Sequence, residues 1–241
     1  MKTILQEEAA TKLLLGEALI YPTDICIAGA TGLVGHELLL LLAHLDEVRS
    51  IKAISRSPMG RIPPHVENII MDFDSLEQRK EVLKAGVFIC CLGTTIKKAG
   101  SQEAFRKVDH DYVVNFAKVA EACGAQKFLV ISAMGADAES SIFYNRVKGE
   151  MESELRKLKI PQIEIFRPSL ILGDRKESRT GEEIAQKLSP LLNTLMVGPL
   201  KKYRAIKANT IARAMAIATL NFHPGFHVYE SDHIQRIADQ K

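Results

Sequence analysis

The chain lacks the features that mark several classes of protein. It has no tryptophan, and its four cysteines are spaced in a way that fits no zinc-binding pattern: Cys26, Cys90, Cys91 and Cys123. Three of them lie in apolar, strand-like runs, so we expect buried, reduced thiols rather than disulfides. These absences favour a cytoplasmic protein without a bound metal.

Strong net charge and long apolar runs are missing as well. There are 32 basic and 29 acidic residues, a net charge of +3, so we expect no nucleic-acid partner. The leucine run at 38–42 is far too short to span a bilayer. Glu7 and Glu8 interrupt the N-terminal apolar positions, which excludes a secretory signal. The basic run 201–204 is expected to be a solvated loop, with a phosphate or partner site as the alternative.

The most informative segment is the glycine turn Gly29-Ala30-Thr31-Gly32-Leu33-Val34-Gly35. An apolar run, 24–28, precedes it, and a leucine-rich helical pattern, 38–45, follows it. In this setting the first glycine takes a tight turn, the second lets the backbone approach a pyrophosphate, and the third lets the helix pack on the strand. The helix N-terminus would face the phosphate charge. The turn predicts a dinucleotide site, with an ordinary structural turn as the alternative.

Strand-like and helical segments alternate along most of the chain. The expected strands are 24–28, 49–55, 66–71, 87–91, 127–132 and 163–167, and the expected helices are 38–45, 103–122 and 143–158. This alternation predicts one Rossmann-type α/β domain over 1–241, a doubly wound parallel sheet with helices on both faces. We expect a helical extension at 1–22. Residues from about 172 to 241 should form a small substrate region, with helices at 184–195 and 210–220 and a last strand at 226–229.

Tyr144 and Lys148 are four residues apart on one expected helix and therefore share a face. A nearby ammonium favours the phenolate form of a tyrosine, which can exchange a proton with a carbonyl or alcohol as hydride moves. Ser132 ends an expected strand, at the sheet edge where ligands bind, and could bond the same oxygen. Each signal has a structural alternative: a chance pair on a helix for the first two residues and a turn for the serine.

With both motifs in view, the chain resembles an atypical short-chain dehydrogenase/reductase. It is similar to the extended, NADPH-binding branch that includes the Tat-interacting protein, from about Asp24 to Leu220. Further segments that resemble this branch are Met71-Asp72-Phe73, Cys91-Leu92-Gly93-Thr94-Thr95, 131–137, Phe166-Arg167-Pro168 and 174–179.

The resemblance implies roles for individual residues. The residues that would bind the pyrophosphate are Gly29, Thr31, Gly32, Leu33, Val34 and Gly35. Those on the adenine would be Asp72 and Phe73, and those on the ribose and nicotinamide side Leu92, Gly93 and Thr94, with Pro168 to Leu170 covering the nicotinamide. The catalytic set would be Ser132, Tyr144 and Lys148, the last two also contacting the cofactor. Family members often place an asparagine in the central helix; this chain has Val108-Asp109-His110-Asp111 there, with Asn115 a helical step away, so the fourth member stays open.

Cofactor choice follows from the end of the second strand, Ala53-Ile54-Ser55-Arg56-Ser57. NAD sites usually place a carboxylate there for the ribose 2′-hydroxyl, and this strand has none. Arg56 can pair with a 2′-phosphate through a charge-assisted fork, so we predict NADP(H). The alternative is that Arg56 is merely solvated.

Two functions remain open. The first is an NADPH-dependent oxidoreductase that acts on a small carbonyl or alcohol, with Tyr144 as general acid/base. The second is an NADPH-sensing regulatory or protein-interaction module with little turnover, because the related branch is associated with protein partners. The charged segment 174–181 would be a substrate lid or a solvated connection. We expect a monomer or a homodimer.

Overall fold

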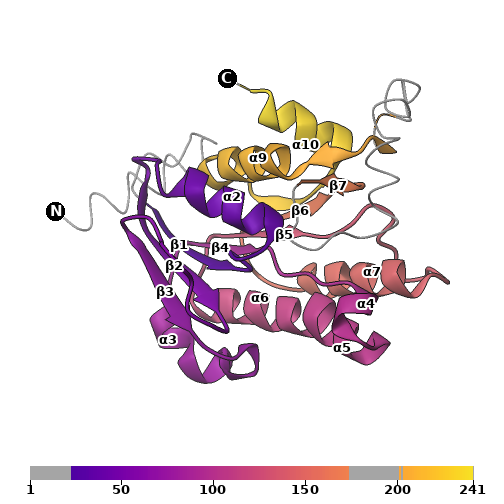
Figure 1. Cartoon of the computed structure of the whole chain (residues 1–241), viewed down its shortest axis with the longest axis horizontal. Coiled ribbons are helices and arrows are strands. Elements are labelled where there is room, and N and C mark those ends of the chain that lie inside the picture. The colour runs from indigo at the N-terminus through magenta and orange to yellow at the C-terminus, as the bar shows by residue number, and fades with distance from the viewer. Residues whose placement is uncertain (1–22, 174–200, 202, 241) are drawn as a thin grey trace.

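The computed structural model describes residues 23–173, 201 and 203–240 (Figure 1). Three predicted features lie outside the described residues: the N-terminal helix at 1–22, the charged segment 174–181 and the helix at 184–195.

The described chain is built on a parallel sheet of seven strands. They are β1 (Thr23–Ala28), β2 (Val48–Ser55), β3 (Val66–Ile70), β4 (Val87–Cys90), β5 (Lys127–Ile131), β6 (Gln162–Arg167) and β9 (Gly225–Glu230). Their order is β3-β2-β1-β4-β5-β6-β9, and every pairing is parallel. The order reverses between β1 and β4, which is the arrangement of a dinucleotide-binding sheet. The predicted Rossmann-type doubly wound fold is confirmed.

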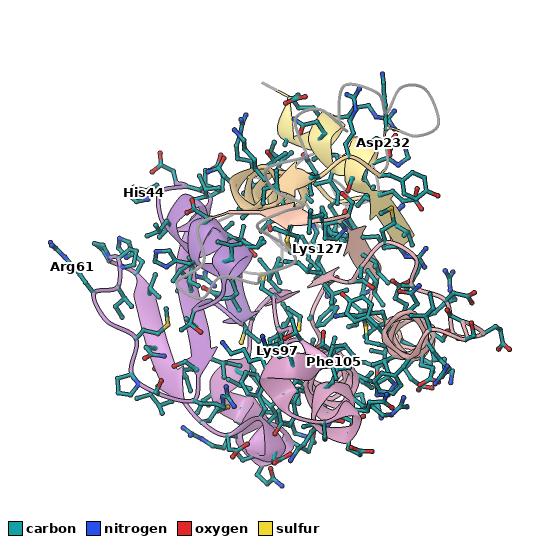
Figure 2. The ribbon with its side chains drawn as sticks, turned by 45° about the vertical axis from the view of Figure 1, so that its right-hand side comes forward. His44, Arg61, Lys97, Phe105, Lys127 and Asp232 are labelled. Carbon is teal, nitrogen blue, oxygen red and sulfur yellow. The ribbon has the colours of Figure 1, made fainter. Side chains whose placement is uncertain are left out.

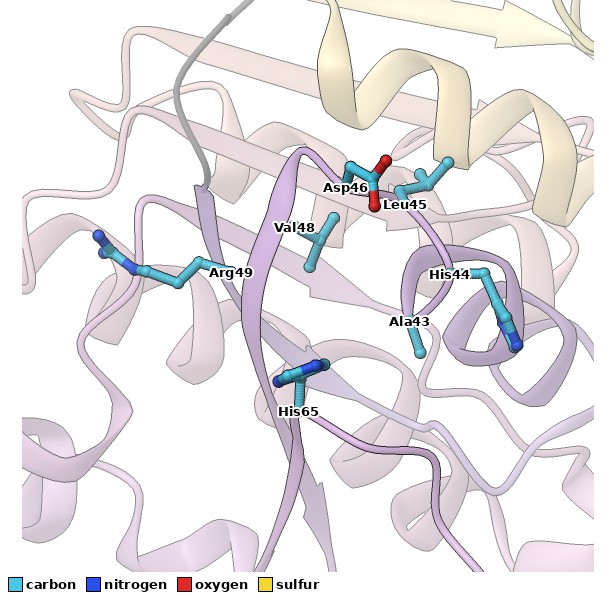
Figure 3. Close-up of a pocket in the computed structure, with 7 residues that line it drawn as sticks. All are labelled: Ala43, His44, Leu45, Asp46, Val48, Arg49 and His65. Atoms are coloured by element: carbon cyan, nitrogen blue, oxygen red, sulfur yellow. The ribbon is translucent and has the colours of Figure 1, made fainter.

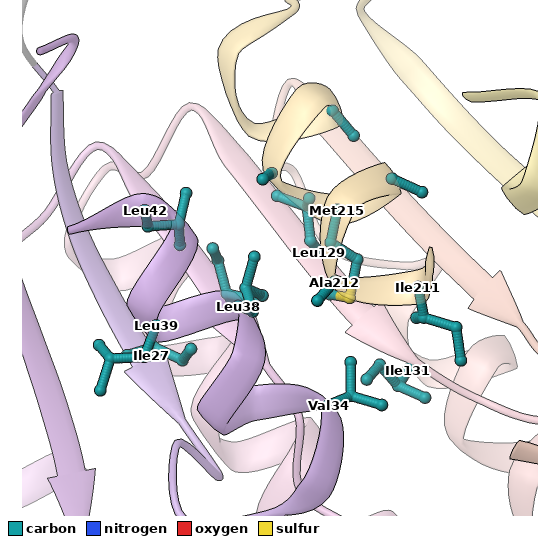
Figure 4. Close-up of a cluster of buried hydrophobic side chains, with 14 of the residues drawn as sticks. Ile27, Val34, Leu38, Leu39, Leu42, Leu129, Ile131, Ile211, Ala212 and Met215 are labelled. Carbon is teal, nitrogen blue, oxygen red and sulfur yellow. The ribbon is translucent and has the colours of Figure 1, made fainter. Parts of the chain in front are cut away.

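Helices cover both faces of the sheet (Figure 1). One face carries α2 (Leu33–Leu42), α9 (Ala208–Leu220) and α10 (Ser231–Ala238); the other carries α6 (Tyr112–Ala122) and α7 (Phe143–Leu155). Strand side chains alternate between the faces, so Ile25 and Ile27 join the first core while Cys26 joins the second. Figure 4 shows the first core, where leucines of α2 meet Met215 of α9 above Ile27.

Smaller elements connect these layers. They are the 3₁₀ turns η1 (Phe73–Ser75) and η2 (Glu77–Arg79), the short helices α3 (Lys80–Leu83), α4 (Ile96–Ala99) and α5 (Gln102–Arg106), and a separate two-stranded pair, β7 (Ile171–Leu172) with β8 (Ile206–Lys207).

The structure differs from the sequence prediction in the central helix. The helix expected at 103–122 is divided by a π-helical turn, η3 (Lys107–Asp111), between α5 and α6.

The C-terminal helix and the last strand expected at 210–220 and 226–229 are present as α9 and β9. Strand β9 joins the main sheet next to β6, and α9 packs against α2. The alanine-rich face of α9 allows this close packing and buries Ile211, Ala212 and Met215 completely. The substrate role expected for about 172–241 stays a prediction.

Lys127 opens β5 with a completely buried side chain (Figure 2). Its ammonium donates hydrogen bonds to the carbonyl oxygens of Ala218 (2.6 Å), Thr219 (3.0 Å) and Asn221, at the C-terminal end of α9. These carbonyls have no partner inside the helix, and a cation also complements the helix dipole there. Burial lowers the pKa of Lys127 to about 8. The lysine therefore joins α9 to the sheet at the end opposite the ligand edge.

The glycine turn fits its surroundings because its members have no side chains. Gly29 has a φ of 84°, and a Cβ there would lie 2.5 Å from the carbonyl carbon of Cys91, just after β4. A Cβ on Gly35 would overlap the carbonyl oxygen of Gly29. The chain after β1, the chain after β4 and the first turn of α2 are therefore in direct backbone contact where the strand order reverses.

The change Gly35→Ala should therefore destabilise the protein, because the overlapping atom belongs to backbone and cannot rotate away. We expect a loss of roughly 2 kcal/mol in the free energy of unfolding, measured by urea denaturation. Gly60→Ala is the matched control: a Cβ there meets nothing within 4 Å, so its effect should stay within about 0.5 kcal/mol. Equal effects of the two changes would contradict the close-packing argument.

Candidate functional site

The predicted pyrophosphate residues lie at the carboxyl ends of the parallel strands, between β1 and β4. Helix α2 has Gly32 as its N-cap, with no side-chain cap and no acidic residue in the first turn. Its first N–H groups are therefore not bonded by a side-chain cap. Thr31 and Gly32 are exposed, whereas Val34 and Gly35 are buried against the sheet. A backbone cradle beside an uncapped helix end fits the phosphates of a dinucleotide.

Lys148 lies on α7 and forms a buried ion pair on the face of the sheet opposite α2. Its Nζ lies 2.7 Å from Oδ1 of Asp109, and both side chains are at most 4% exposed. The second carboxylate oxygen of Asp109 accepts a hydrogen bond from the backbone N–H of Thr94, at 2.8 Å. Burial by itself lowers the pKa of Lys148, but the charge and hydrogen bond of Asp109, together with the nearby Tyr144 and Cys90, outweigh burial and hold the pKa above its ordinary value. Lys148 is thus positively charged and tied to the loop after β4.

The π-helical turn explains how Asp109 reaches this position. Asp109 lies in the middle of η3, and it is 1% exposed while the neighbouring Asp111 is half-exposed. One such turn inside an α-helix shifts the side chains relative to a regular helix, and such turns are frequent at functional sites. Sequence reasoning left the fourth member of the site open at this stretch. The structure brings Asp109, not Asn115, to Lys148.

Tyr144 lies at the start of α7, one helical turn from Lys148. Its side chain is 36% exposed, and its ring packs on that of Phe105 with centroids 5.5 Å apart. Phe105 is completely buried and also contacts Phe143, so it supports the first turn of α7. The predicted Tyr-Lys neighbourhood is present, with the phenol at the surface and the ammonium inside.

Glu152 continues the same face of α7, four residues beyond Lys148. Its carboxylate is paired with Arg167 at the end of β6, through contacts of 2.5 to 3.1 Å. Pairing with Glu152 raises the pKa of Arg167. Glu152 also accepts a hydrogen bond of 2.5 Å from the Ser132 hydroxyl. Sequence reasoning missed Glu152, although the spacing 144, 148, 152 marks a single helix face.

The Ser132 contact bears on the predicted catalytic set. Glu152 lies eight residues after Tyr144, which corresponds to about 12 Å along the helix axis. Ser132 is 4% exposed, and its hydroxyl proton is directed to Glu152. The structure therefore places Ser132 beside the Glu152–Arg167 pair, and its predicted contact with a substrate oxygen remains a prediction.

The other predicted cofactor residues lie along the same sheet edge. Arg56 follows β2 and is exposed. Asp72 is exposed and caps η1 by accepting a hydrogen bond from the N–H of Asp74 at 2.9 Å, while Phe73 is buried and packs on the Tyr112 ring at 5.4 Å. The loop after β4 holds Leu92 and Gly93 next to Thr94.

The segment after β6 also reaches the glycine turn. The carbonyl of Pro168 accepts a hydrogen bond from the N–H of Met134, after β5, and that of Leu170 accepts one from Ile206. A Cβ on Gly173 would lie 3.0 Å from the Leu33 side chain. The chain after β6 thus meets the chain after β5 and the start of α2 at the carboxyl edge of the sheet.

A separate hollow lies at the opposite end of the sheet. Its volume is about 340 Å³, and it is lined by Ala43, His44, Leu45, Asp46, Val48, Arg49 and His65 (Figure 3). Val48 begins β2 and His65 precedes β3, so the hollow is on the amino side of the strands, away from the glycine turn. Within residues 23–173 and 203–240, no group of three or more metal-ligating side chains occurs. In the same ranges no helix combines the length and hydrophobicity needed to cross a membrane.

The chain is similar to curated proteins over most of its length. It is 36% identical over 168 residues to Protein HTATIP2 of Rattus norvegicus, which covers 68% of this chain and 69% of that protein. It is 32% identical over 228 residues to Protein fmp52, mitochondrial, of Emericella nidulans, which covers 88% of this chain and 97% of that one. No family model matches the chain.

Solved structures share the fold at low sequence identity. MoeE5 in complex with UDP-glucuronic acid and NAD has a TM-score of 0.64 at 15% identity, covering 85% of this chain and 75% of that chain. Human epimerase family protein SDR39U1 with NADPH has a TM-score of 0.60 at 14% identity, covering 85% and 72%.

These comparisons correct one prediction and confirm another. The predicted cytoplasmic location is wrong, since the fungal relatives from Scheffersomyces stipitis, Emericella nidulans and Candida albicans are named mitochondrial. That prediction depended mainly on unpaired cysteines, which indicate a reducing environment but not one particular compartment. The predicted resemblance is confirmed: the chain belongs to the family of the HTATIP2 and FMP52 proteins, and it shares its fold with the two solved structures.

Proposed function

We propose that the protein is an NADP(H)-dependent oxidoreductase that acts on a small carbonyl or alcohol. The observation that carries this proposal is the buried Lys148–Asp109 pair, joined to the loop after β4 through Thr94 and lying one helical turn from Tyr144. A charged lysine is costly to bury unless it is paired. Its presence next to the predicted nicotinamide loop therefore points to a use in binding or chemistry.

In the proposed mechanism the cofactor supplies the hydride, and the chain positions the groups that move the proton. Tyr144 donates its phenolic proton to the carbonyl oxygen, or accepts one when an alcohol is oxidised. Lys148 provides the positive charge that stabilises the phenolate, and it would hold the nicotinamide ribose. Asp109 fixes the ammonium in place and would be the fourth member of the set. The residues that would bind the pyrophosphate are Gly29, Thr31, Gly32, Leu33, Val34 and Gly35. Those that would make the remaining contacts are Arg56, Asp72, Phe73, Leu92, Gly93, Thr94, Pro168 and Leu170.

A second function is favoured by the placement of Ser132. Its hydroxyl donates to Glu152. In this arrangement Tyr144 would be the one member of the predicted Ser-Tyr-Lys set that donates a hydrogen bond to the substrate oxygen. A site of this kind suits a protein that binds NADPH and presents a surface to a protein partner, with little turnover. Partner affinity that changes with NADPH, together with no reduction across a panel of carbonyls, would favour this reading.

Replacing the phenol tests the proposed acid. Tyr144→Phe should lower kcat at least about 100-fold, because general acid catalysis of this size is lost with the hydroxyl. Affinity for NADPH, followed by nicotinamide fluorescence, should change little. Tyr229→Phe is the matched control, since its hydroxyl faces Glu164 on β6 at 3.4 Å, and it should keep its turnover. Turnover that survives Tyr144→Phe would remove Tyr144 from the mechanism.

Arg56→Ala tests the choice of cofactor. Loss of a charge-assisted bond to the 2′-phosphate should raise the Kd for NADPH about tenfold and leave the Kd for NADH nearly unchanged. Arg49→Ala is the control: it lies at the other end of β2, in an ion pair with Asp24. An equal rise in the Kd values of both cofactors with Arg56→Ala would contradict the assignment to NADP(H).

Asp109→Asn tests the buried pair independently of the reaction. The change leaves the Lys148 charge without a counter-charge, so the free energy of unfolding should fall by roughly 3 kcal/mol. The matched control is Asp111→Asn, whose side chain is 49% exposed, and its effect should stay within about 0.5 kcal/mol. If Asp109→Asn were as stable as the wild type in urea denaturation, the pair would not hold Lys148 as described.

A further inference from the structure

Asn68 connects the end of β2 to the loop that follows it. It lies on β3 opposite Ala53 of β2. Its Nδ2 donates hydrogen bonds to the Ala53 carbonyl (3.0 Å) and to the Ser55 hydroxyl oxygen (2.7 Å), and its Oδ1 accepts one from the Met59 N–H (2.8 Å). One side-chain amide thus contacts three points on both sides of Arg56.

Ser55 extends this connection across Arg56. Its hydroxyl accepts from Asn68 and donates to the carbonyl oxygen of Ser57 at 2.6 Å, and the residue is only 6% exposed. The backbone just before and just after Arg56 is therefore held by a two-step chain of hydrogen bonds. Met59, the fourth residue of the loop, is partly buried and packs against the core under α2.

The two arginines of this loop differ in whether hydrogen bonds hold the backbone around them. Arg56 lies inside the bridged segment, whereas Arg61 lies beyond Met59 and projects away from the body of the protein (Figure 2). A guanidinium bonds a phosphate through a planar fork, so its affinity depends on where its backbone is held. Ordering a free loop on binding would cost part of that affinity.

We propose that Asn68 is the positioning residue that sets the preference for a ribose 2′-phosphate, by fixing the backbone from which Arg56 reaches it. This inference rests on the proposed NADP(H) function. The side chain must both donate and accept, since Ala53 and Ser55 require a donor and Met59 requires an acceptor. An amide of this length meets all three contacts, and neither alanine nor aspartate does.

The test compares two adenosine fragments that differ in the 2′-phosphate, 2′,5′-ADP and 5′-AMP, by calorimetric titration of the full chain. The wild type should prefer 2′,5′-ADP, and Arg56→Ala should abolish the preference. Asn68→Ala should reduce the ratio of the two dissociation constants about tenfold while 5′-AMP affinity changes less than about twofold. The double variant should lose no more than Arg56→Ala alone, because the two residues act through one contact.

Two further variants keep the result interpretable. Ser55→Ala removes both bonds of the serine hydroxyl, from Asn68 and to Ser57, and keeps the Asn68 bonds to Ala53 and Met59. It should lower the same ratio, even if Asn68→Ala fails to fold. Asn209→Ala is the matched control, since Asn209 is exposed on α9 with a single bond of 3.4 Å to Glu37, and it should keep the wild-type ratio.

The outcomes separate the two proposals. A wild type without preference for 2′,5′-ADP would overturn the NADP(H) assignment, and this inference with it. A preference that Arg56→Ala abolishes but that Asn68→Ala and Ser55→Ala both retain would overturn the role of Asn68 alone. Equal weakening of both fragments by Asn68→Ala would assign the residue a purely structural role and would also overturn it.

Discussion

The contact of three backbone segments around Gly29 is the constraint on which the rest of the structure depends. The chain after β1, the chain after β4 and the first turn of α2 meet there without intervening side chains. This contact places the uncapped start of α2 and the loop with Thr94 on the same sheet edge. Because the strand order reverses at this point, the helices diverge to opposite faces and leave the edge open to a ligand.

Buried charge is handled in the same way at three places in the described chain. Lys148 is paired with Asp109, Glu152 with Arg167, and Lys127 with the carbonyl end of α9. Each group has a partner, which offsets most of the cost of leaving water. Two of these pairs lie along one face of α7, near the ligand edge, while Lys127 lies at the opposite end and stabilises the attachment of α9. The two pairs on α7 and the attachment of α9 by Lys127 therefore lie at opposite ends of one sheet.

The proposed function divides between two regions that are distant in the sequence. The end of β2 and the amide of Asn68 hold the group that would select the cofactor. The π-helical turn and α7 hold the groups that would transfer the proton. The Ser132 hydroxyl donates to Glu152 of α7, within the Glu152–Arg167 pair. The difference between an oxidoreductase and a cofactor-sensing module lies mainly in whether Tyr144 can act without that hydroxyl.

The sequence by itself determined the parts that depend on local pattern. Alternating apolar runs predicted the parallel sheet, the glycine spacing predicted the turn at its edge, and the i, i+4 spacing predicted that Tyr144 and Lys148 share a helix face. The tertiary structure alone decided which charges meet. Asp109 reaches Lys148 through a π-helical turn, Ser132 bonds Glu152 across the sheet edge, and Lys127 caps a helix some 90 residues away, as its bond to Ala218 shows. Such contacts depend on the packing of distant segments, and the local sequence pattern around each residue does not indicate which partner it will meet.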